Sequence, residues 1–149
     1  MTTPTLPSNE AVTRVVALFE TLTPASVATL PAFYAADARF KDPFNDVRGL
    51  AAITAIFAHM FEAMEAPRFV VRERILQGQQ CFLTWEFRFR FRRFRPEQEQ
   101  VILGGSHLVF DSAGLVTLHR DYWDAAEELY EKLPVVGGVM RWLKKRANS

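Results

Sequence analysis

Cysteine and net charge are the two things that this sequence has least of. Its 149 residues include a single cysteine, Cys81, so no disulfide forms within the chain, and no Cys/His cluster has metal-ligand spacing. A formal net charge of +1 gives no general basis for binding nucleic acid or a membrane surface. No apolar run is long enough to span a bilayer, and the start MTTPTLPSNE lacks the basic and apolar regions of a signal peptide. These absences predict a soluble protein of a reducing cytoplasm.

A glycine-rich phosphate loop is also missing. The paired glycines of LGGSH (103–107) lie inside a strand pattern, where they permit a bulge or strong curvature of the strand. The sequence therefore predicts neither a metal nor a cofactor.

Apolar residues, in contrast, are abundant. They make up 49% of the chain and include 13 Phe and 3 Trp. A chain of this length forms one domain that buries a sizeable core. We expect a single domain over residues 1–149, with its core at about 10–124 and a helical tail over 125–149.

The first part of the chain has helical periodicity. In NEAVTRVVALFETL the apolar residues fall on one helical stripe: Val12, Val15, Val16, Phe19 and Leu22. Thr23 and Pro24 are a good N-cap and first-turn pair, which predicts a second helix through about Tyr34.

A third helix is expected after a short extended piece, Ala38 to Asp42, and a loop through Gly49. LAAITAIFAHMFEAM carries a helical stripe that we interpret as core, and Pro67 marks its end. The stripe consists of Ile53, Ile56, Met60 and Met64, beside Phe57 and Phe61.

From residue 68 the period changes to two, which predicts four long strands: FVVRERIL, CFLTWEFRFRFRRF, VILGGSHLVF and LVTLHRDYWD. The second has the clearest alternation, with Trp85, Phe87, Phe89 and Phe91 on one face and Glu86, Arg88, Arg90 and Arg92 on the other. Because rings and guanidinium groups lie on opposite faces, we favour a solvated or dimer-forming outer face over nucleic-acid stacking. The loop PEQEQ (96–100) supplies compensating charge. The order of helices and strands predicts an α+β fold, with helices covering one face of an antiparallel sheet.

The stretch FYAADARFKDPFND (33–46) places a carboxylate, Asp42, at the end of a short strand. Asp followed by Pro is ordinary turn chemistry, in which the carboxylate bonds the backbone ahead of it. The alternative is a carboxylate at the mouth of an apolar pocket, where desolvation raises its pKa and makes it a useful base.

Three stretches carry a family resemblance: FYAADARFKDPF, GLAAITAIF and GLVTLHRDYWD. Together they resemble the bacterial ketosteroid isomerases of the nuclear-transport-factor-2-like (NTF2-like) superfamily, which also contains SnoaL-type cyclases, epoxide hydrolases and binding-only members. The resemblance covers roughly residues 10–124. It implies a cystatin-like cone, in which a curved antiparallel sheet wraps around three N-terminal helices and encloses one apolar pocket. It also implies a homodimer through the outer sheet face.

Carried over residue by residue, the resemblance gives Asp42 the place of the isomerase general base and Tyr34 the place of a pocket tyrosine. The two oxyanion donors of that family are missing. One falls at Leu18 or Phe19, and the other at Ser106, a weak candidate to replace it. A supporting tyrosine becomes Phe57. Loss of one such donor typically lowers the rate ~10²–10³-fold.

The last strand adds polar groups of its own. By the same alignment His119, Asp121 and Trp123 face the pocket, and a period of two puts them on one side. With Asp42 they make two carboxylates and an imidazole, a set suited to acid–base work. The alternatives are that His119 and Asp121 satisfy one another structurally, or that Asp121 pairs with Arg120 or another arginine. His59 and His107 are expected in structural roles.

Two main functions stay open. The first is an enzyme that acts on a hydrophobic small molecule by proton transfer: isomerisation, cyclisation, dehydration or epoxide opening. Asp42 would be the base, His119 and Asp121 its partners, and the pocket wall would include Tyr34, Phe57, Trp85, Phe87, Ser106 and Trp123. The second is a non-catalytic binding domain.

A third reading is a dimeric interaction module whose pocket is filled by its own side chains. A cavity of ~300 Å³ or more would favour a ligand over this module. For the tail AAEELYEKLPVVGGVMRWLKKRANS we expect a helix, a break at 134–138 and a short basic helix. That basic helix either packs on the domain or touches an anionic membrane surface.

Overall fold

The computed structural model describes residues 8–93 and 95–128. Within them, α1 (Ser8–Glu20) is followed by the 3₁₀ helix η1 (Pro24–Ala32), by α2 (Leu50–Ala63) and, near the end, by one turn of helix, α3 (Ala125–Glu128). The strands are β1 (Tyr34–Lys41), β2 (Asp46–Arg48), β3 (Met64–Gln77), β4 (Gln80–Phe91), β5 (Gln100–Phe110) and β6 (Val116–Tyr122). Residues 129–149, with the predicted break and basic helix, lie outside the described part.

The helices form where the sequence predicts them, with one change of type and one earlier end: α2 ends at Ala63, and Pro67, predicted to mark its end, lies within β3. The apolar stripe of α1 is buried, as expected for an amphipathic helix. Thr23 caps the second helix in a reciprocal capping box with Ser26, and Pro24 follows in its first turn. This helix is 3₁₀ and ends at Ala32, two residues before Tyr34. The carbonyl of Phe33 then accepts a hydrogen bond from the amide of Val116, next to the first register pair of β1 with β6.

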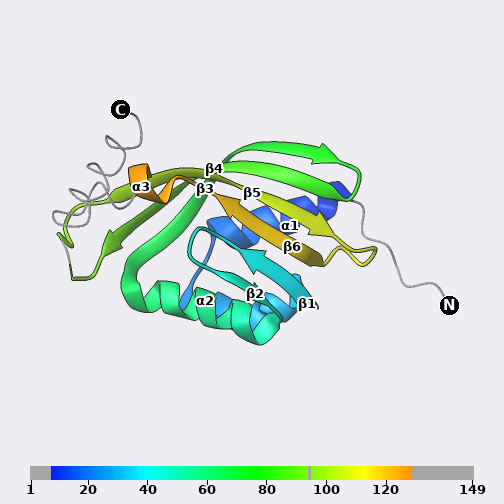
Figure 1. The fold of residues 1–149 in the computed structure, drawn as a ribbon, viewed down its shortest axis with the longest axis horizontal. Helices are drawn as coiled ribbons and strands as arrows, with labels where there is room; N and C mark the ends of the chain where they lie inside the picture. The colour runs from blue at the N-terminus through cyan, green and yellow to red at the C-terminus, as the bar shows by residue number, and fades with distance from the viewer. Residues whose placement is uncertain (1–7, 94, 129–149) are drawn as a thin grey trace, which may run out of the picture.

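All six strands form one sheet in the order β2-β1-β6-β5-β4-β3 (Figure 1). The expectation of a purely antiparallel sheet was wrong at one pair, since β1 runs parallel to β6. A parallel pair needs a long crossover, and here α2 and the four strands β2 to β5 supply it. The predicted loop before Gly49 also contains β2, which pairs antiparallel with β1.

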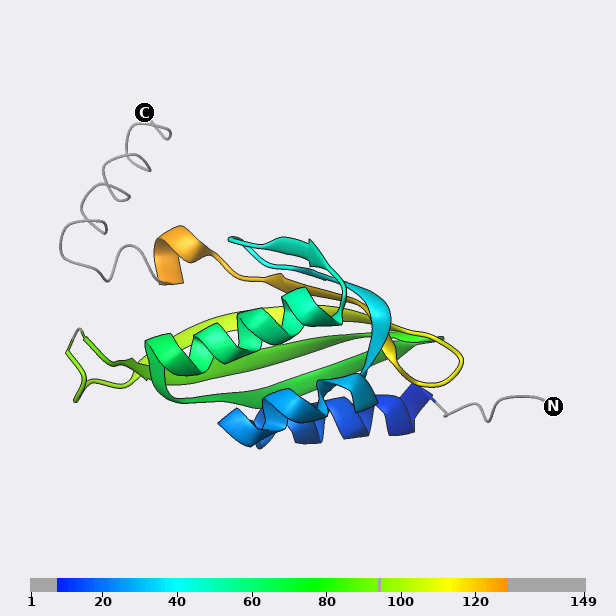
Figure 2. The same ribbon diagram turned by 90° about the horizontal axis from the view of Figure 1, so that it is seen from below.

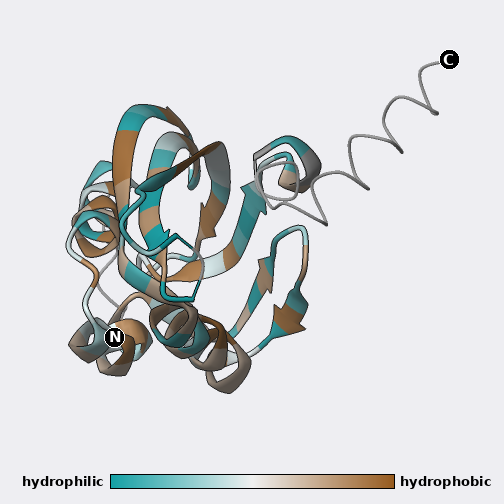
Figure 3. Cartoon of the chain, turned by 90° about the vertical axis from the view of Figure 1, so that its left-hand side faces the viewer, coloured by the Kyte–Doolittle hydropathy of each residue, from teal (hydrophilic) through white to brown (hydrophobic). Residues whose placement is uncertain are grey.

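The sheet curves around the helices, so that α1 and α2 lie on its concave side (Figures 2 and 3). Its strands alternate between hydrophilic and hydrophobic residues in Figure 3. In β4 the side chains of Trp85, Phe87 and Phe89 are buried, and Phe87 stacks on Phe69 of β3 with ring centroids 4.5 Å apart. This confirms the predicted division of β4 into an aromatic and a charged face.

The charged face of the sheet is neutralised locally. Glu86 forms ion pairs with Arg72 and Arg88. Arg88 also pairs with Glu99 of the loop before β5, as the compensating charge of that loop predicted. Of the two alternatives for the paired glycines of β5, a bulge or strong curvature, the bulge is absent from the β4–β5 ladder, which continues in register through Gly104 and Gly105. In the described part of the chain, no helix has the length and apolar character needed to cross a membrane.

Candidate functional site

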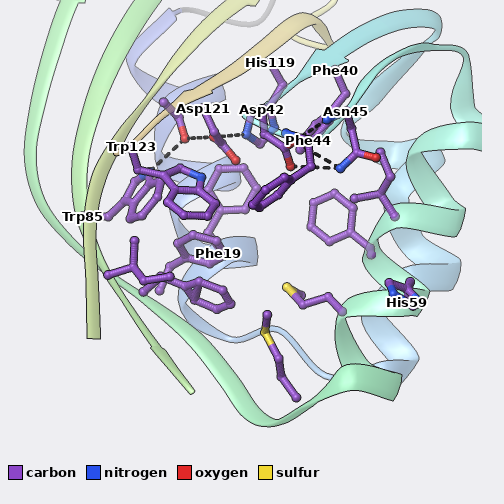
Figure 4. A pocket seen from close by; sticks show the side chains of 18 of the residues that line it. Phe19, Phe40, Asp42, Phe44, Asn45, His59, Trp85, His119, Asp121 and Trp123 are labelled. Atoms are coloured by element: carbon purple, nitrogen blue, oxygen red, sulfur yellow. Dashed lines mark hydrogen bonds and ion pairs between the residues drawn. The ribbon is translucent and has the colours of Figure 1, made fainter. Parts of the chain in front are cut away.

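A cavity of about 260 Å³ lies between the concave face of the sheet and helices α1 and α2 (Figure 4). Side chains from both sides of the fold line it, and most of them are apolar or aromatic. The aromatic members are Phe19, Phe40, Phe44, Phe57, Phe69, Trp85, Phe87 and Trp123. Polar groups gather at one end, where Asp42 and Asp121 lie near the ends of neighbouring strands.

His119 and Asp121, both on β6, form the centre of this polar end. The side chains are two residues apart on the same face, and His119 Nε2 lies 2.7 Å from Asp121 Oδ1. The exposed fractions are only 4% for the histidine side chain and 12% for the aspartate side chain. A carboxylate this deeply buried needs fixed hydrogen-bond donors, and the imidazole N–H is the first of them.

Ser106 on β5 supplies the second donor. Its Oγ is 2.5 Å from Asp121 Oδ1, and the indole Nε1 of Trp85 lies 2.8 Å from the same Oγ. Because an indole N–H only donates, Ser106 accepts from Trp85 and donates its own proton to Asp121. The serine proton is therefore committed to the protein and is not available to a substrate oxyanion.

Tyr34 completes the network from behind His119. Its hydroxyl is 2.6 Å from His119 Nδ1, and the two rings stack nearly parallel. Burial first, and the charge of Asp121 second, raise the pKa of the Tyr34 hydroxyl well above its ordinary value, so this hydroxyl keeps its proton. Because a carboxylate only accepts, the imidazole of His119 carries a proton on Nε2 that is directed at Asp121.

The network leaves one carboxylate oxygen unused. Oδ1 of Asp121 accepts from His119 and Ser106, whereas no described residue forms a hydrogen bond with Oδ2. The side chain lines the cavity, so a molecule held there meets a carboxylate oxygen that is fixed in place.

Asp42 has a different environment. Its Oδ1 accepts from the backbone amides of Phe44 and Asn45, at 2.8 and 2.7 Å, and the Asn45 side-chain amide lies 3.1 Å from Oδ1 and 3.2 Å from Oδ2. This is the turn chemistry that the Asp-Pro pair indicated. Asp42 also lines the cavity, so its turn position and its pocket position coexist.

The parallel pairing of β1 and β6 brings the two aspartates together. Lys41 pairs in register with Arg120, so Asp42 and Asp121 directly follow at neighbouring positions. Strands in a sheet are about 4.8 Å apart. A second cavity, of about 190 Å³, adjoins this point and includes Lys41, Arg120 and both aspartates in its lining.

The structure places most of the expected site residues around the cavity. Phe57, Trp85, Phe87, Ser106, His119, Asp121, Trp123 and Asp42 all line it. Tyr34, expected in the wall, is not among the lining residues, because His119 stands between its hydroxyl and the cavity.

Sequence reasoning missed one side of the cavity. The stripe of α2 that was interpreted as core contributes Ile56, Met60 and Met64 to the lining, while Ile53 is fully buried. The helical period shows that these residues face inward, but it does not distinguish a packed neighbour from an empty space. His59 reaches the cavity from the exposed side of α2, where it lies 3.6 Å from Glu62.

Within the described ranges, no group of three His, Cys, Asp or Glu side chains has an arrangement that would hold a metal ion. His107 faces away from the cavity and bonds Gln80 at 2.8 Å.

Comparison with known proteins extends over most of the chain. A family model described as SnoaL-like domain matches residues 15–119. No curated protein gives a significant match.

Several solved structures share the fold at low sequence identity. An NTF2-like protein of unknown function from Burkholderia pseudomallei K96243 is 17% identical, with a TM-score of 0.69 over 82% of this chain and 95% of the other. A hypothetical protein with a ketosteroid isomerase-like fold from Catenulispora acidiphila DSM 44928, in complex with trimethylamine, is 17% identical, with a TM-score of 0.67 over 80% of this chain and 89% of the other. An LEH-like epoxide hydrolase of M. tuberculosis is also 17% identical, with a TM-score of 0.67 over 80% of this chain and 86% of the other. At such identity the likeness shows the fold and not the activity.

Proposed function

The chain belongs to the SnoaL-like domain family, and we propose that its cavity binds a small apolar molecule whose polar group forms a hydrogen bond with Asp121. The observation that carries the proposal is the state of the Asp121 carboxylate. One oxygen accepts from two fixed donors, and the other has no hydrogen bond from a described residue, at the end of a cavity walled by aromatic rings. A carboxylate oxygen that is held in place at a cavity and has its lone pairs unused can accept from a ligand, and a ligand that donates to it gains binding free energy.

The size of the cavity supports a compact ligand. Its 260 Å³ does not reach the ~300 Å³ that would favour a ligand over a pocket filled by its own side chains, but it is above the roughly 150 Å³ that suffices for benzene. Molecules of one or two rings fit this space. A relative of the same fold was crystallised with trimethylamine, which supports small-molecule binding as a use of the fold.

Binding is tested by NMR titration of the ¹⁵N-labelled protein with indole. We expect the indole N–H signals of Trp85 and Trp123 to shift with saturation. Ala63→Phe places a ring into the cavity lining and should weaken binding at least tenfold, whereas Ala51→Phe, on an exposed position of the same helix, should not. Shifts that do not saturate, or equal effects of the two variants, would contradict binding in the cavity.

A second candidate function is acid–base catalysis, with Asp121 in place of Asp42 as the base. It is favoured by the same free oxygen, because a base needs a lone pair directed at the substrate while its other contacts hold it in place. Asp42 would then be the second carboxylate, fixed by its turn. Ketone isomerisation through an oxyanion is the form least supported, because Ser106 donates to Asp121.

The catalytic candidate is tested by incubating the protein with 1-phenyl-2-propanone in D₂O and following deuterium at the carbons next to the carbonyl by mass spectrometry. A general base would accelerate the exchange, and Asp121→Asn would return it to the buffer rate. Exchange at the buffer rate with the wild-type chain would exclude proton abstraction from this class of substrate and leave the binding function. The homodimer through the outer sheet face stays a prediction, which sedimentation equilibrium would test.

A further inference from the structure

We infer that the molecule preferred by this cavity is a small organic ammonium ion, bound with its N–H directed at Asp121 Oδ2 and its apolar groups against the aromatic wall. This inference rests on the proposed small-molecule binding and adds the charge of the ligand to it. It depends on the charges, the donors and the rings that line the cavity.

Apart from its two histidines, the titratable side chains of the lining are acidic. Asp42 and Asp121 are its two carboxylates, and no lysine or arginine is among the residues that line this cavity. His119 is already paired within the protein, with Nε2 at Asp121 Oδ1 and Nδ1 at the Tyr34 hydroxyl. Lys41 and Arg120 line the adjoining smaller cavity, which shares both aspartates with this one. Lys41 lies 3.8 Å from Asp46, and the Arg120 guanidinium stacks 4.6 Å from the ring centroid of Tyr122. An anionic ligand would thus meet two carboxylates without a cation in the lining to pair with it.

The donors of the lining are mostly committed. The N–H groups of Trp85 and His119 and the hydroxyl of Ser106 are used within the network, and the Asn45 amide is used by Asp42. The indole N–H of Trp123 forms no hydrogen bond with another described residue. A neutral alcohol could use Trp123 and Asp121 together, and it is therefore the competitor that the experiment has to include.

The aromatic rings suit a cation better than a neutral alkyl group. Trp123 and Phe44 pack edge to face with ring centroids 5.5 Å apart and lie beside both aspartates (Figure 4). Ring faces attract a cation within about 6 Å, most strongly when it is desolvated, and Trp is the best of them. A buried carboxylate gains most from a partner that is both charged and a donor.

The test uses three probes of nearly the same shape: benzyldimethylamine, 1-phenyl-2-propanol and isobutylbenzene. The amine is protonated at pH 7, as a lysine side chain is. The alcohol is neutral with a donor, and the hydrocarbon has neither charge nor donor. Affinities are measured at pH 7 by ¹⁵N NMR titration of the wild-type chain. We expect the ammonium ion to bind at least tenfold more tightly than either neutral probe.

Two variants test whether Asp121 is the residue that causes the preference for the ammonium ion. Asp121→Asn removes the charge and keeps a side chain that still accepts from Ser106, and it should abolish the preference for the ammonium ion. Asp37→Asn changes an exposed carboxylate of the same sheet outside the cavity and should leave the preference intact. Saturable binding of isobutylbenzene or the alcohol at equal or higher affinity in the wild-type chain would overturn the inference while the cavity-binding function stands. If none of the three probes binds, both the inferred preference for an ammonium ion and the proposed binding function are wrong.

Discussion

Ser106 Oγ lies 2.5 Å from Asp121 Oδ1, across the register pair that joins β5 to β6. This contact connects two parts of the site that the sequence suggested separately. It links the indole of Trp85 in the pocket wall to the carboxylate at the polar end. Ser106 therefore holds Asp121 in place and does not itself contact the substrate as a donor.

Replacement of Ser106 by alanine removes that link. The variant leaves the buried N–H of Trp85 without an acceptor and takes one donor from Asp121, so we expect a loss of ~1–3 kcal/mol in the free energy of unfolding. Urea unfolding followed by circular dichroism measures it. Ser112→Ala, in an exposed turn, is the matched control and should change stability by less than ~0.5 kcal/mol. A Ser106→Ala variant as stable as this control would show that the Trp85 N–H finds another acceptor.

Asp42 is both a hydrogen-bond acceptor in its turn and a charged group at the cavity, and two substitutions distinguish the effects of these roles on stability. In its turn the carboxylate acts as an acceptor for the amides of Phe44 and Asn45, a role that an asparagine oxygen also performs. Asp42→Asn should therefore unfold within ~0.5 kcal/mol of the wild-type chain, and Asp42→Ala should cost about 1 kcal/mol. Thermal unfolding of both variants measures the difference. Equal losses in the two variants would show that the charge of Asp42, and not its turn, stabilises the fold.

Gly104 makes room for Trp85 in the cavity wall. A Cβ added at this position would lie 2.6 Å from Trp85 Cη2 and 2.9 Å from the carbonyl oxygen of Tyr122. The indole cannot yield without breaking its hydrogen bond to Ser106, so we expect Gly104→Ala to destabilise the fold by ~1–3 kcal/mol and to change the tryptophan fluorescence. Gly78→Ala is the control variant in which the added methyl group meets no other atom, since nothing lies within 4 Å of its Cβ position. The positive φ of Gly78 adds backbone strain to this variant. A Gly104→Ala variant with wild-type stability and fluorescence would contradict this packing.

The sequence predicted the helices, the long strands and the inward face of β4 because each depends on a local period. It did not predict the parallel pairing of β1 with β6, since that pairing depends on where a crossover of more than 70 residues returns the chain. The same pairing places Asp42 next to Asp121. Local sequence indicated a turn at Asp42 and a period-two pair at His119 and Asp121, but not their proximity.

The position of Tyr34 shows a second limit of prediction from the sequence. Alternation along a strand gives the face on which a side chain lies, and it does not give the depth at which the side chain ends. Tyr34 lies on the inner face, 1% exposed, with His119 between its hydroxyl and the cavity. Ser106 was likewise expected on the correct face, but its hydroxyl is directed by Trp85 and Asp121, two side chains that are distant in sequence.

Burial of Tyr34 makes the stability of the fold depend on pH in the alkaline range. In the folded chain burial and the charge of Asp121 raise the pKa of its hydroxyl well above the ordinary 10.0, whereas in the unfolded chain it ionises near that value. Above pH 10 the unfolded state therefore binds fewer protons than the folded state, and the free energy of unfolding falls as the pH rises. Tyr34 alone contributes up to about 1.4 kcal/mol per pH unit to this fall.

Tyr34→Phe removes the titrating group and should reduce the slope of stability against pH above pH 10, measured by urea unfolding between pH 8 and 11. Cys81 provides the internal comparison, because burial raises the pKa of its thiol from 9.0 to about 11 and gives a slope of the same sign that begins near pH 9. Cys81→Ala should therefore flatten the profile from pH 9, and Tyr34→Phe only from pH 10. If Tyr34→Phe lowers stability equally at every pH without changing the slope, the hydroxyl ionises in the folded chain as readily as in the unfolded one.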